Sequence, residues 1–183
     1  MFIETEATPN PATLKFLPGQ EVLGDETANF TSAAAAEVSP LAARLFQLDE
    51  VSGVFLGSDF ITVTKSGGDW SGLKTEILGI IMDHFVSGQP VLTGPLPQAG
   101  DAGASAEDEE IIAQIKELLD TRVRPAVAQD GGDIVFHGFE KGIVYLHMQG
   151  ACSGCPSSTM TLKHGIENLL RHFVPEVESV EAV

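Results

Sequence analysis

The sequence predicts an α+β protein, made of two small two-layer α/β domains joined by a flexible linker rich in proline, glycine and acidic residues. Strand-like and helix-like segments follow one another within each half of the chain. The stretch between the halves has a composition that cannot hold a regular element. The length of 183 residues suits one domain or two small ones. We place the domains at residues 1–87 and 111–183, and the linker at 88–110.

The first domain is expected to run strand, strand, helix, strand, strand, helix. Its turn at Thr8-Pro9-Asn10-Pro11 follows from proline, which fixes its own φ and disfavours helix in the residue before it. Ser39-Pro40 is typical of a helix start, with a capping hydroxyl followed by proline at the first helical position. The predicted elements are strands at 2–6 and 13–17, a helix from Ser39-Pro40, strands at 51–56 and 60–64, and a helix whose buried face holds Leu73, Ile77, Ile80, Ile81 and His84.

The linker and the second domain follow from a change of composition. Glycine and proline at 88–97 give way to a small, acidic stretch at 98–110. The second domain is then expected to run helix, strand, strand, helix, strand. Its predicted elements are a helix from Ile111 that Pro125 kinks or stops, a turn at Asp130-Gly131-Gly132-Asp133, a hairpin of strands at 134–139 and 143–149, a helix that Pro175 ends, and a last strand at 177–183.

Charge and cysteine content exclude several classes of protein. Ten basic and 26 acidic residues give a formal charge of −16, which repels nucleic acid and anionic membrane surfaces. Residues 1–11 carry two acids and no basic group, unlike a secretory or transit peptide. Two cysteines three positions apart do not form a secreted disulfide framework. We therefore expect a soluble, reduced protein of the bacterial cytoplasm, or of the mitochondrial matrix if the chain is a processed organellar form.

The two cysteines, Cys152 and Cys155, are the candidate functional residues. They stand between a predicted strand and a helix whose first residue is expected to be Pro156. The unpaired N–H groups and positive dipole of a helix N-terminus favour thiolate, the form that attacks and that binds metals. Gly150 and Gly154 let the backbone turn so that both sulfurs can face outward. The loop therefore suits a reactive or metal-binding site.

The residues alone leave four interpretations of this pair open. The thiols can be inert or form a local disulfide. They can form a thioredoxin-like redox site, although only 28 residues follow Cys155, too few for the rest of that fold (183 − 155). They can bind zinc, which needs two more ligands; none of the five histidines has a suitable partner spacing. They can bind an iron–sulfur cluster, for which two chains related by a two-fold axis would supply four thiolates.

At these residues the chain resembles the Nfu family, the NifU-type iron–sulfur cluster scaffolds. The resemblance covers both halves and omits only the linker and the segment near residues 20–37. In the second half it rests on Ile115 to Asp120, Arg124-Pro125, Asp130 to Asp133, Gly150 to Ser158, Thr161 to Lys163, Gly165 to Glu167 and Val174 to Val177. In the first half it rests on Thr8 to Phe16 and Gly57 to Val63.

The resemblance implies a non-enzymatic scaffold or carrier. It implies a [4Fe-4S] cluster that bridges two copies of the second domain in a homodimer, with Cys152 and Cys155 of each chain as ligands. It also implies delivery of the cluster to apo iron–sulfur proteins. The sequence offers no other catalytic constellation: we interpret the five histidines, Tyr145 and Arg171 as structural or surface residues, and Asp130 and Asp133 as turn and capping residues.

Overall fold

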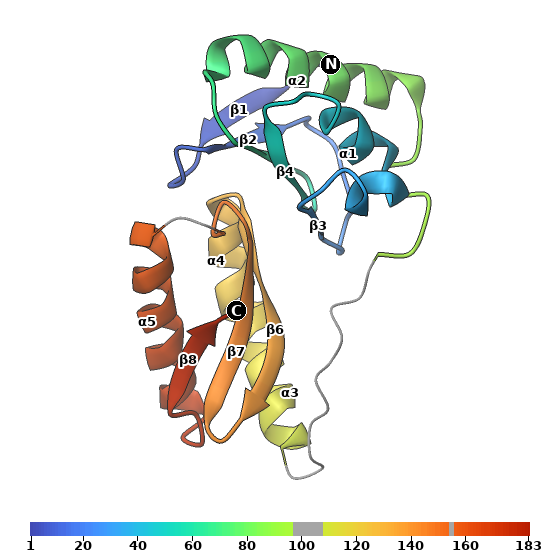
Figure 1. Ribbon diagram of the computed structural model, residues 1–183. Coiled ribbons are helices and arrows are strands. Elements are labelled where there is room, and N and C mark those ends of the chain that lie inside the picture. The colour runs from blue at the N-terminus through green and yellow to red at the C-terminus, as the bar shows by residue number, and fades with distance from the viewer. Residues whose placement is uncertain (97–107, 154–155) are drawn as a thin grey trace. The chain divides into compact units, whose positions relative to one another are not determined.

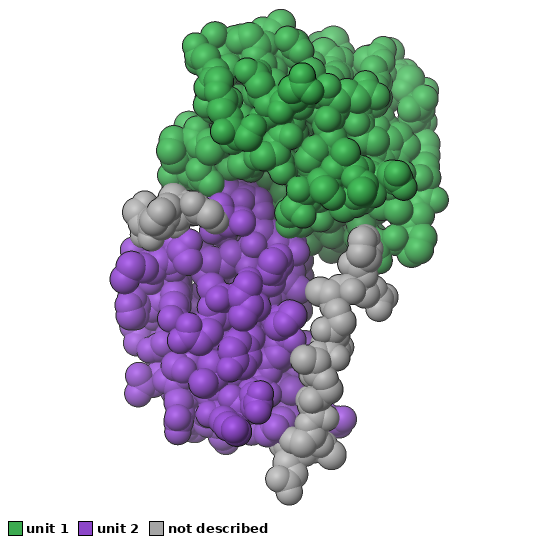
Figure 2. Space-filling model, in the orientation of Figure 1, with its two compact units in different colours: residues 1–97 green, residues 98–183 purple. Residues whose placement is uncertain are grey.

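The computed structural model describes residues 1–96, 108–153 and 156–183, with side chains of the last segment described from Thr159 onward. The chain divides into two compact units, Met1–Pro97 and Gln98–Val183 (Figures 1 and 2). Each unit combines helices with one sheet, so the predicted α+β class is confirmed.

The first unit is a five-stranded antiparallel sheet with helices packed on it. Its strand order is β1-β2-β5-β4-β3. Buried residues of the strands, such as Phe16 and Val63, share one cluster with Leu41 and Ile77 of the two α-helices. The elements are β1 (Glu4–Ala7), β2 (Thr13–Leu17), β3 (Ala28–Phe30), the 3₁₀ turn η1 (Ala35–Val38), α1 (Pro40–Leu45), β4 (Val51–Leu56), β5 (Ile61–Lys65) and α2 (Trp70–Ser87).

The predicted order of strands and helices in the first unit is found, with two additions. The helix start at Ser39-Pro40 is confirmed, because Ser39 caps α1 by accepting the N–H of Ala42 at 3.2 Å. The sequence prediction omitted β3 and η1, which lie between β2 and α1. β3 is three residues long and exists through its pairing with β4, in which Asn29 faces Phe55. Such a pairing between distant segments leaves no local signal.

The first part of the predicted linker contacts the first unit. Val91 accepts a hydrogen bond from the Ser39 hydroxyl at 2.7 Å, and Thr93 donates its N–H to Val38 at 2.8 Å. Leu92 and Leu96 pack against the core of the same unit. Residues 97–107 of the predicted linker lie outside the described residues. The linker boundaries and its flexibility therefore stay a prediction.

The second unit is a three-stranded sheet with helices on one face. The strand order is β6-β7-β8, with β6 and β7 antiparallel and β7 and β8 parallel. Val144 and Leu146 of β7 share one buried cluster with Ile115 of the first helix and Leu170 of the last. The elements are α3 (Glu109–Leu118), the π-helical turn η2 (Leu119–Val123), α4 (Arg124–Gln129), β6 (Gly132–Glu140), β7 (Ile143–Gly150), α5 (Pro156–Phe173) and β8 (Ser179–Ala182).

The helix before the sheet continues through Pro125 and does not stop there. A wide turn, η2, precedes the proline, and the N–H of Arg124 bonds the carbonyl of Leu119, five residues earlier. α4 then runs on to Gln129, with the proline in its first turn. In a regular α-helix, proline cannot donate a hydrogen bond to the carbonyl four residues earlier, and its ring collides with that carbonyl. A widened turn before the proline accommodates the ring within the helix. The widened turn thus ends where α4 begins, at Arg124.

Candidate functional site

Cys152 lies at the junction between β7 and α5. β7 ends at Gly150, whose φ of +62° turns the chain out of the sheet, and α5 begins at Pro156, as the sequence predicts. The Cys152 residue is 7% exposed and belongs to the buried cluster of the second unit, whereas the sequence led us to expect a sulfur that faces outward. The second predicted ligand, Cys155, lies outside the described residues. The structure therefore places one of the two predicted ligands, four residues before the first residue of the 18-residue helix α5 (156 − 152).

The turn before β6 contacts the cysteine loop directly. The carbonyl of Gly131 accepts the N–H of Ala151 at 3.1 Å, and Gly132 pairs with Gly150 at the end of the β6–β7 ladder. A Cβ atom built on Gly132 would overlap the Cys152 Sγ and come within 2.9 Å of the Cys152 backbone nitrogen. The Asp130–Asp133 turn and the cysteine loop are thus packed together without room for a further carbon atom.

A buried ion pair holds the same turn against α4. Arg124 donates two hydrogen bonds to Asp133, from Nε to Oδ1 at 2.9 Å and from Nη2 to Oδ2 at 3.0 Å. The Asp133 side chain is 4% exposed, and its Oδ1 also accepts the N–H of Ile134 at 2.8 Å. Arg124 further bonds the exposed Asp120 at 3.0 Å. Hydrogen bonding to Asp133 raises the pKa of Arg124 above its ordinary value, so the guanidinium stays charged.

This ion pair changes the interpretation of the two acidic residues of the turn. We predicted turn and capping roles for Asp130 and Asp133. Asp130 is exposed, whereas Asp133 is a buried partner of Arg124. Sequence reasoning did not assign a role to Arg124, because the arginine lies on a helix nine residues before its partner. The only sequence signal was a basic residue beside the proline of the predicted helix.

The histidines do not assemble a metal site in the described part of the chain. Among residues 1–96, 108–153 and 156–183, no group of three or more His, Cys, Asp or Glu side chains could hold a metal. His84, predicted on the buried face of a helix, is fully buried in α2. In the same described residues no helix is long and apolar enough to cross a membrane.

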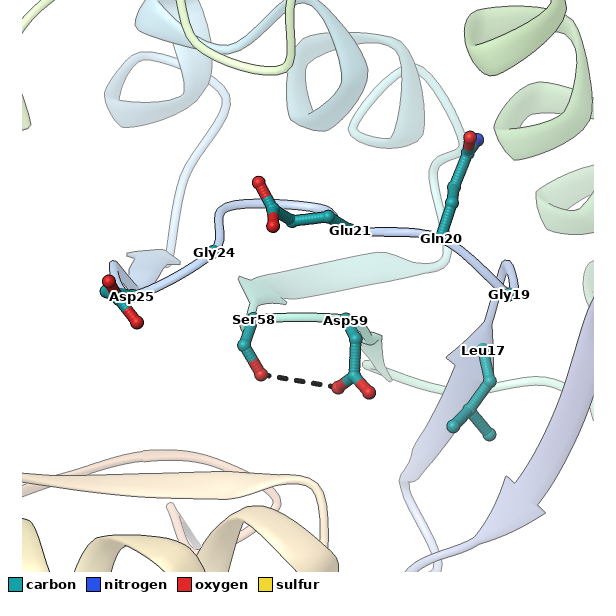
Figure 3. Close-up of a pocket in the computed structure, with 8 residues that line it drawn as sticks. All are labelled: Leu17, Gly19, Gln20, Glu21, Gly24, Asp25, Ser58 and Asp59. Carbon is teal, nitrogen blue, oxygen red and sulfur yellow. Dashed lines mark hydrogen bonds between the residues drawn. The ribbon is translucent and has the colours of Figure 1, made fainter.

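The first unit carries an open pocket that the sequence gave no reason to expect. It has a volume of about 610 Å³ and lies between the loop after β2 and the β4–β5 turn (Figure 3). Three carboxylates line it, those of Glu21, Asp25 and Asp59, together with Ser58. The Ser58 hydroxyl donates to Asp59 at 3.3 Å (Figure 3). The pocket contains no thiol or imidazole, so it does not extend the cysteine site.

Comparison with known proteins identifies the family. Residues 3–88 match the model of the scaffold protein Nfu/NifU N-terminal domain, and residues 115–181 match the NifU-like domain. The chain is 55% identical over its whole length to the human protein named NFU1 iron-sulfur cluster scaffold homolog, mitochondrial, of which it covers 72%. It belongs to the Nfu family.

A second relative agrees with this membership. The NFU1 homolog of Drosophila sechellia, also named mitochondrial, is 55% identical, and the chain spans 65% of its length. A solution structure of a NifU-like protein from Saccharomyces cerevisiae aligns with a TM-score of 0.45 at 28% identity, covering 52% of this chain and 87% of the yeast one. The family is thus one of scaffold proteins by name, and its two named domains occupy the two halves of this chain.

Proposed function

We propose that this Nfu protein carries a [4Fe-4S] cluster as cargo, bound by Cys152 and Cys155 of two chains, and transfers it to apo iron–sulfur proteins without being an enzyme. The observation that supports the proposal is the position of Cys152, between the end of β7 and the start of α5. A helix N-terminus stabilises thiolate, the ligand that iron requires. The relatives named as iron–sulfur cluster scaffolds support the choice of cargo.

The number of thiols supports sharing of the cluster between two chains. The chain has two cysteines, and a four-iron cluster takes four thiolates. Two chains related by a two-fold axis supply all four. A site with two ligands from each chain also suits a carrier, because the thiols of a recipient can displace those of the protein one at a time.

Anaerobic reconstitution tests this proposal. We expect about four irons per two chains, a cluster-bound dimer and a largely monomeric apo protein, measured by iron analysis, Mössbauer spectroscopy and size-exclusion chromatography. Cys152→Ser and Cys155→Ser should each lose the cluster and stay folded, whereas Ser153→Ala, at the exposed position between them, should keep it. A monomer that holds a complete four-iron cluster would contradict the shared site. A colourless protein with bound zinc, or one that catalyses thiol–disulfide exchange, would favour the zinc or redox alternatives.

The first unit is proposed to recognise the recipients. Residues 1–97 carry 12 acidic and 4 basic residues, a net charge of −8, while residues 111–183 carry 9 and 6, a net charge of −3. An acidic surface attracts basic partners over long distances and speeds their association. Salt screens this attraction between charges more than about 10 Å apart at 0.1 M. Raising salt should therefore slow cluster transfer from the full chain more than from residues 111–183. Equal transfer by both at every salt concentration would show that the acids serve only solubility.

The compartment and the independence of the domains are further proposals. The names of the relatives place those proteins in mitochondria, which favours the mitochondrial matrix over a bacterial cytoplasm for this chain. Residues 111–183 contain both cysteines and the whole predicted second domain. That fragment should fold alone and take up cluster, as checked by circular dichroism and iron analysis. An unfolded fragment would mean that the boundary is misplaced.

A further inference from the structure

Gly132, the first residue of β6, lies against the Cys152 sulfur. A Cβ at this position would overlap Sγ, approach the Cys152 nitrogen to 2.9 Å and approach the Gln149 carbonyl oxygen to 3.0 Å. Two of these three neighbours are backbone atoms, which cannot move aside as a flexible side chain does. Space for the sulfur therefore depends on the absence of a side chain at residue 132.

The requirement at Gly132 concerns space and not backbone conformation. Gly131, with a φ of +76°, and Gly150, with +62°, adopt the left-handed region, where any L-residue is strained. Gly132 is not among the glycines with positive φ and continues into β6 as its first residue. Alanine is thus allowed there by the backbone. A Gly132→Ala substitution therefore tests crowding against Cys152 and the adjacent Gln149 carbonyl, without the backbone strain that a substitution at Gly131 or Gly150 would add.

The Arg124–Asp133 ion pair fixes the strand end that carries Gly132. Asp133 follows Gly132 directly and is held by two hydrogen bonds from Arg124 on α4. On its other side, Gly131 accepts the N–H of Ala151 in the cysteine loop at 3.1 Å. The turn is therefore attached to the helix by one residue and to the cysteine loop by another, with Gly132 between them.

We propose that Gly132 is a positioning residue for cluster binding. Because Gly132 has no side chain, it leaves the space that the Cys152 sulfur occupies, which we call the seat, and this space sets the direction of the sulfur. The Arg124–Asp133 pair holds Gly132, and with it the seat, in place. The role in cluster binding rests on the proposed function, whereas the seat itself is a property of the metal-free chain. With the sulfur in the seat, the Cys152 residue as a whole is 7% exposed and is therefore largely withdrawn from solvent. A side chain at residue 132 displaces the sulfur from this position.

Alkylation of the metal-free full chain tests the seat without any cluster. In a Cys155→Ser background, Cys152 is the sole thiol, because the chain has two cysteines. Gly132→Ala should raise the rate of Cys152 alkylation by iodoacetamide about tenfold, since crowding a filled site favours the displaced, reactive state. Gly165→Ala is the matched control: apart from the neighbouring backbone of α5 itself, no atom lies within 4 Å of the added carbon, and the rate should not change. An unchanged rate in folded Gly132→Ala would overturn the seat.

Cluster retention tests the positioning role. In the chain with both cysteines, Gly132→Ala should release iron to a chelator about tenfold faster than Gly165→Ala, with circular dichroism showing that both are folded. Faster alkylation with normal cluster retention would show a seat that does not position the ligand and would overturn the proposal. Failure of the unsubstituted chain to take up cluster would refute the proposed function and leave the alkylation test standing.

A second variant serves if Gly132→Ala does not fold. Arg124→Lys keeps the positive charge and loses the two-point contact with Asp133, because lysine offers one ammonium group in place of a planar fork. The turn should then loosen, and both alkylation and iron release should rise, by less than in Gly132→Ala. No change in either rate would show that the ion pair does not hold the seat.

Discussion

We expect the largest loss of stability when the ion pair between Arg124 and Asp133 is broken. Arg124→Gln removes two charge-assisted hydrogen bonds to a carboxylate that is 4% exposed, and a third to Asp120. Breaking a buried pair from one side costs about 3–5 kcal/mol, because the remaining charge has lost its partner. The Arg124 side chain is 33% exposed, so water offsets part of this cost. We expect a loss of about 2–3 kcal/mol in the free energy of unfolding of the second unit.

Urea unfolding of the full chain measures this loss. Circular dichroism follows both units, whereas fluorescence of Trp70, the only tryptophan, follows the first unit alone. The free energy of unfolding falls by about 1 kcal/mol per molar urea. The unfolding midpoint of the second unit, which circular dichroism reports and Trp70 does not, should therefore shift to a urea concentration about 2–3 M lower. The Trp70 transition should stay in place, because the substitution lies in the other unit.

A matched arginine substitution shows whether the effect belongs to the buried pair. On α5, Nη1 of Arg171 lies 3.9 Å from Oε1 of Glu167, and the Arg171 side chain is 57% exposed. Exposed pairs of this spacing contribute about 0.3–0.5 kcal/mol, so Arg171→Gln should scarcely move the transition. If Arg124→Gln costs no more than Arg171→Gln, the argument that Asp133 is a buried charge in need of its partner is wrong.

Two further predictions concern the first unit, both followed by Trp70 fluorescence during urea unfolding. Ser39→Ala removes the fully buried cap of α1 and its hydrogen bond to Val91, and should lower the free energy of unfolding by about 1–2 kcal/mol. The control Ser52→Ala, at an exposed position, should lower it by less than about 0.5 kcal/mol. Equal losses would refute the capping argument. Burial, and then the cation of Arg44, lower the pKa of His84 below 6.5, so the unfolded chain takes up the proton first. Stability should be complete above pH 6.5 and fall below it by at most about 1.4 kcal/mol per pH unit, and a His84→Leu variant should lack this slope; an equal slope in both would assign it to other groups.

The sequence determined most of the elements and the candidate cysteines. The helix starting at Pro40, the strand Val51–Leu56 and the hairpin before the cysteine loop follow from caps, alternation and turn glycines, all of which act within a few residues. The start of α5 at Pro156 follows from the same kind of local signal. The order of motifs in both halves indicated the Nfu family, which the family models confirm. The roles of Cys152 and Cys155 stay predictions.

Only the tertiary structure decided what surrounds the cysteine loop. The Arg124–Asp133 pair joins a helix to a turn, β3 forms by pairing with β4, and Gly132 meets the Cys152 sulfur across 20 positions of sequence (152 − 132). Each of these contacts depends on how whole elements pack. Local rules fix φ, ψ and the buried face of an element, but they carry no information about its partner, because close packing selects that partner from the shape and charge of the assembled core.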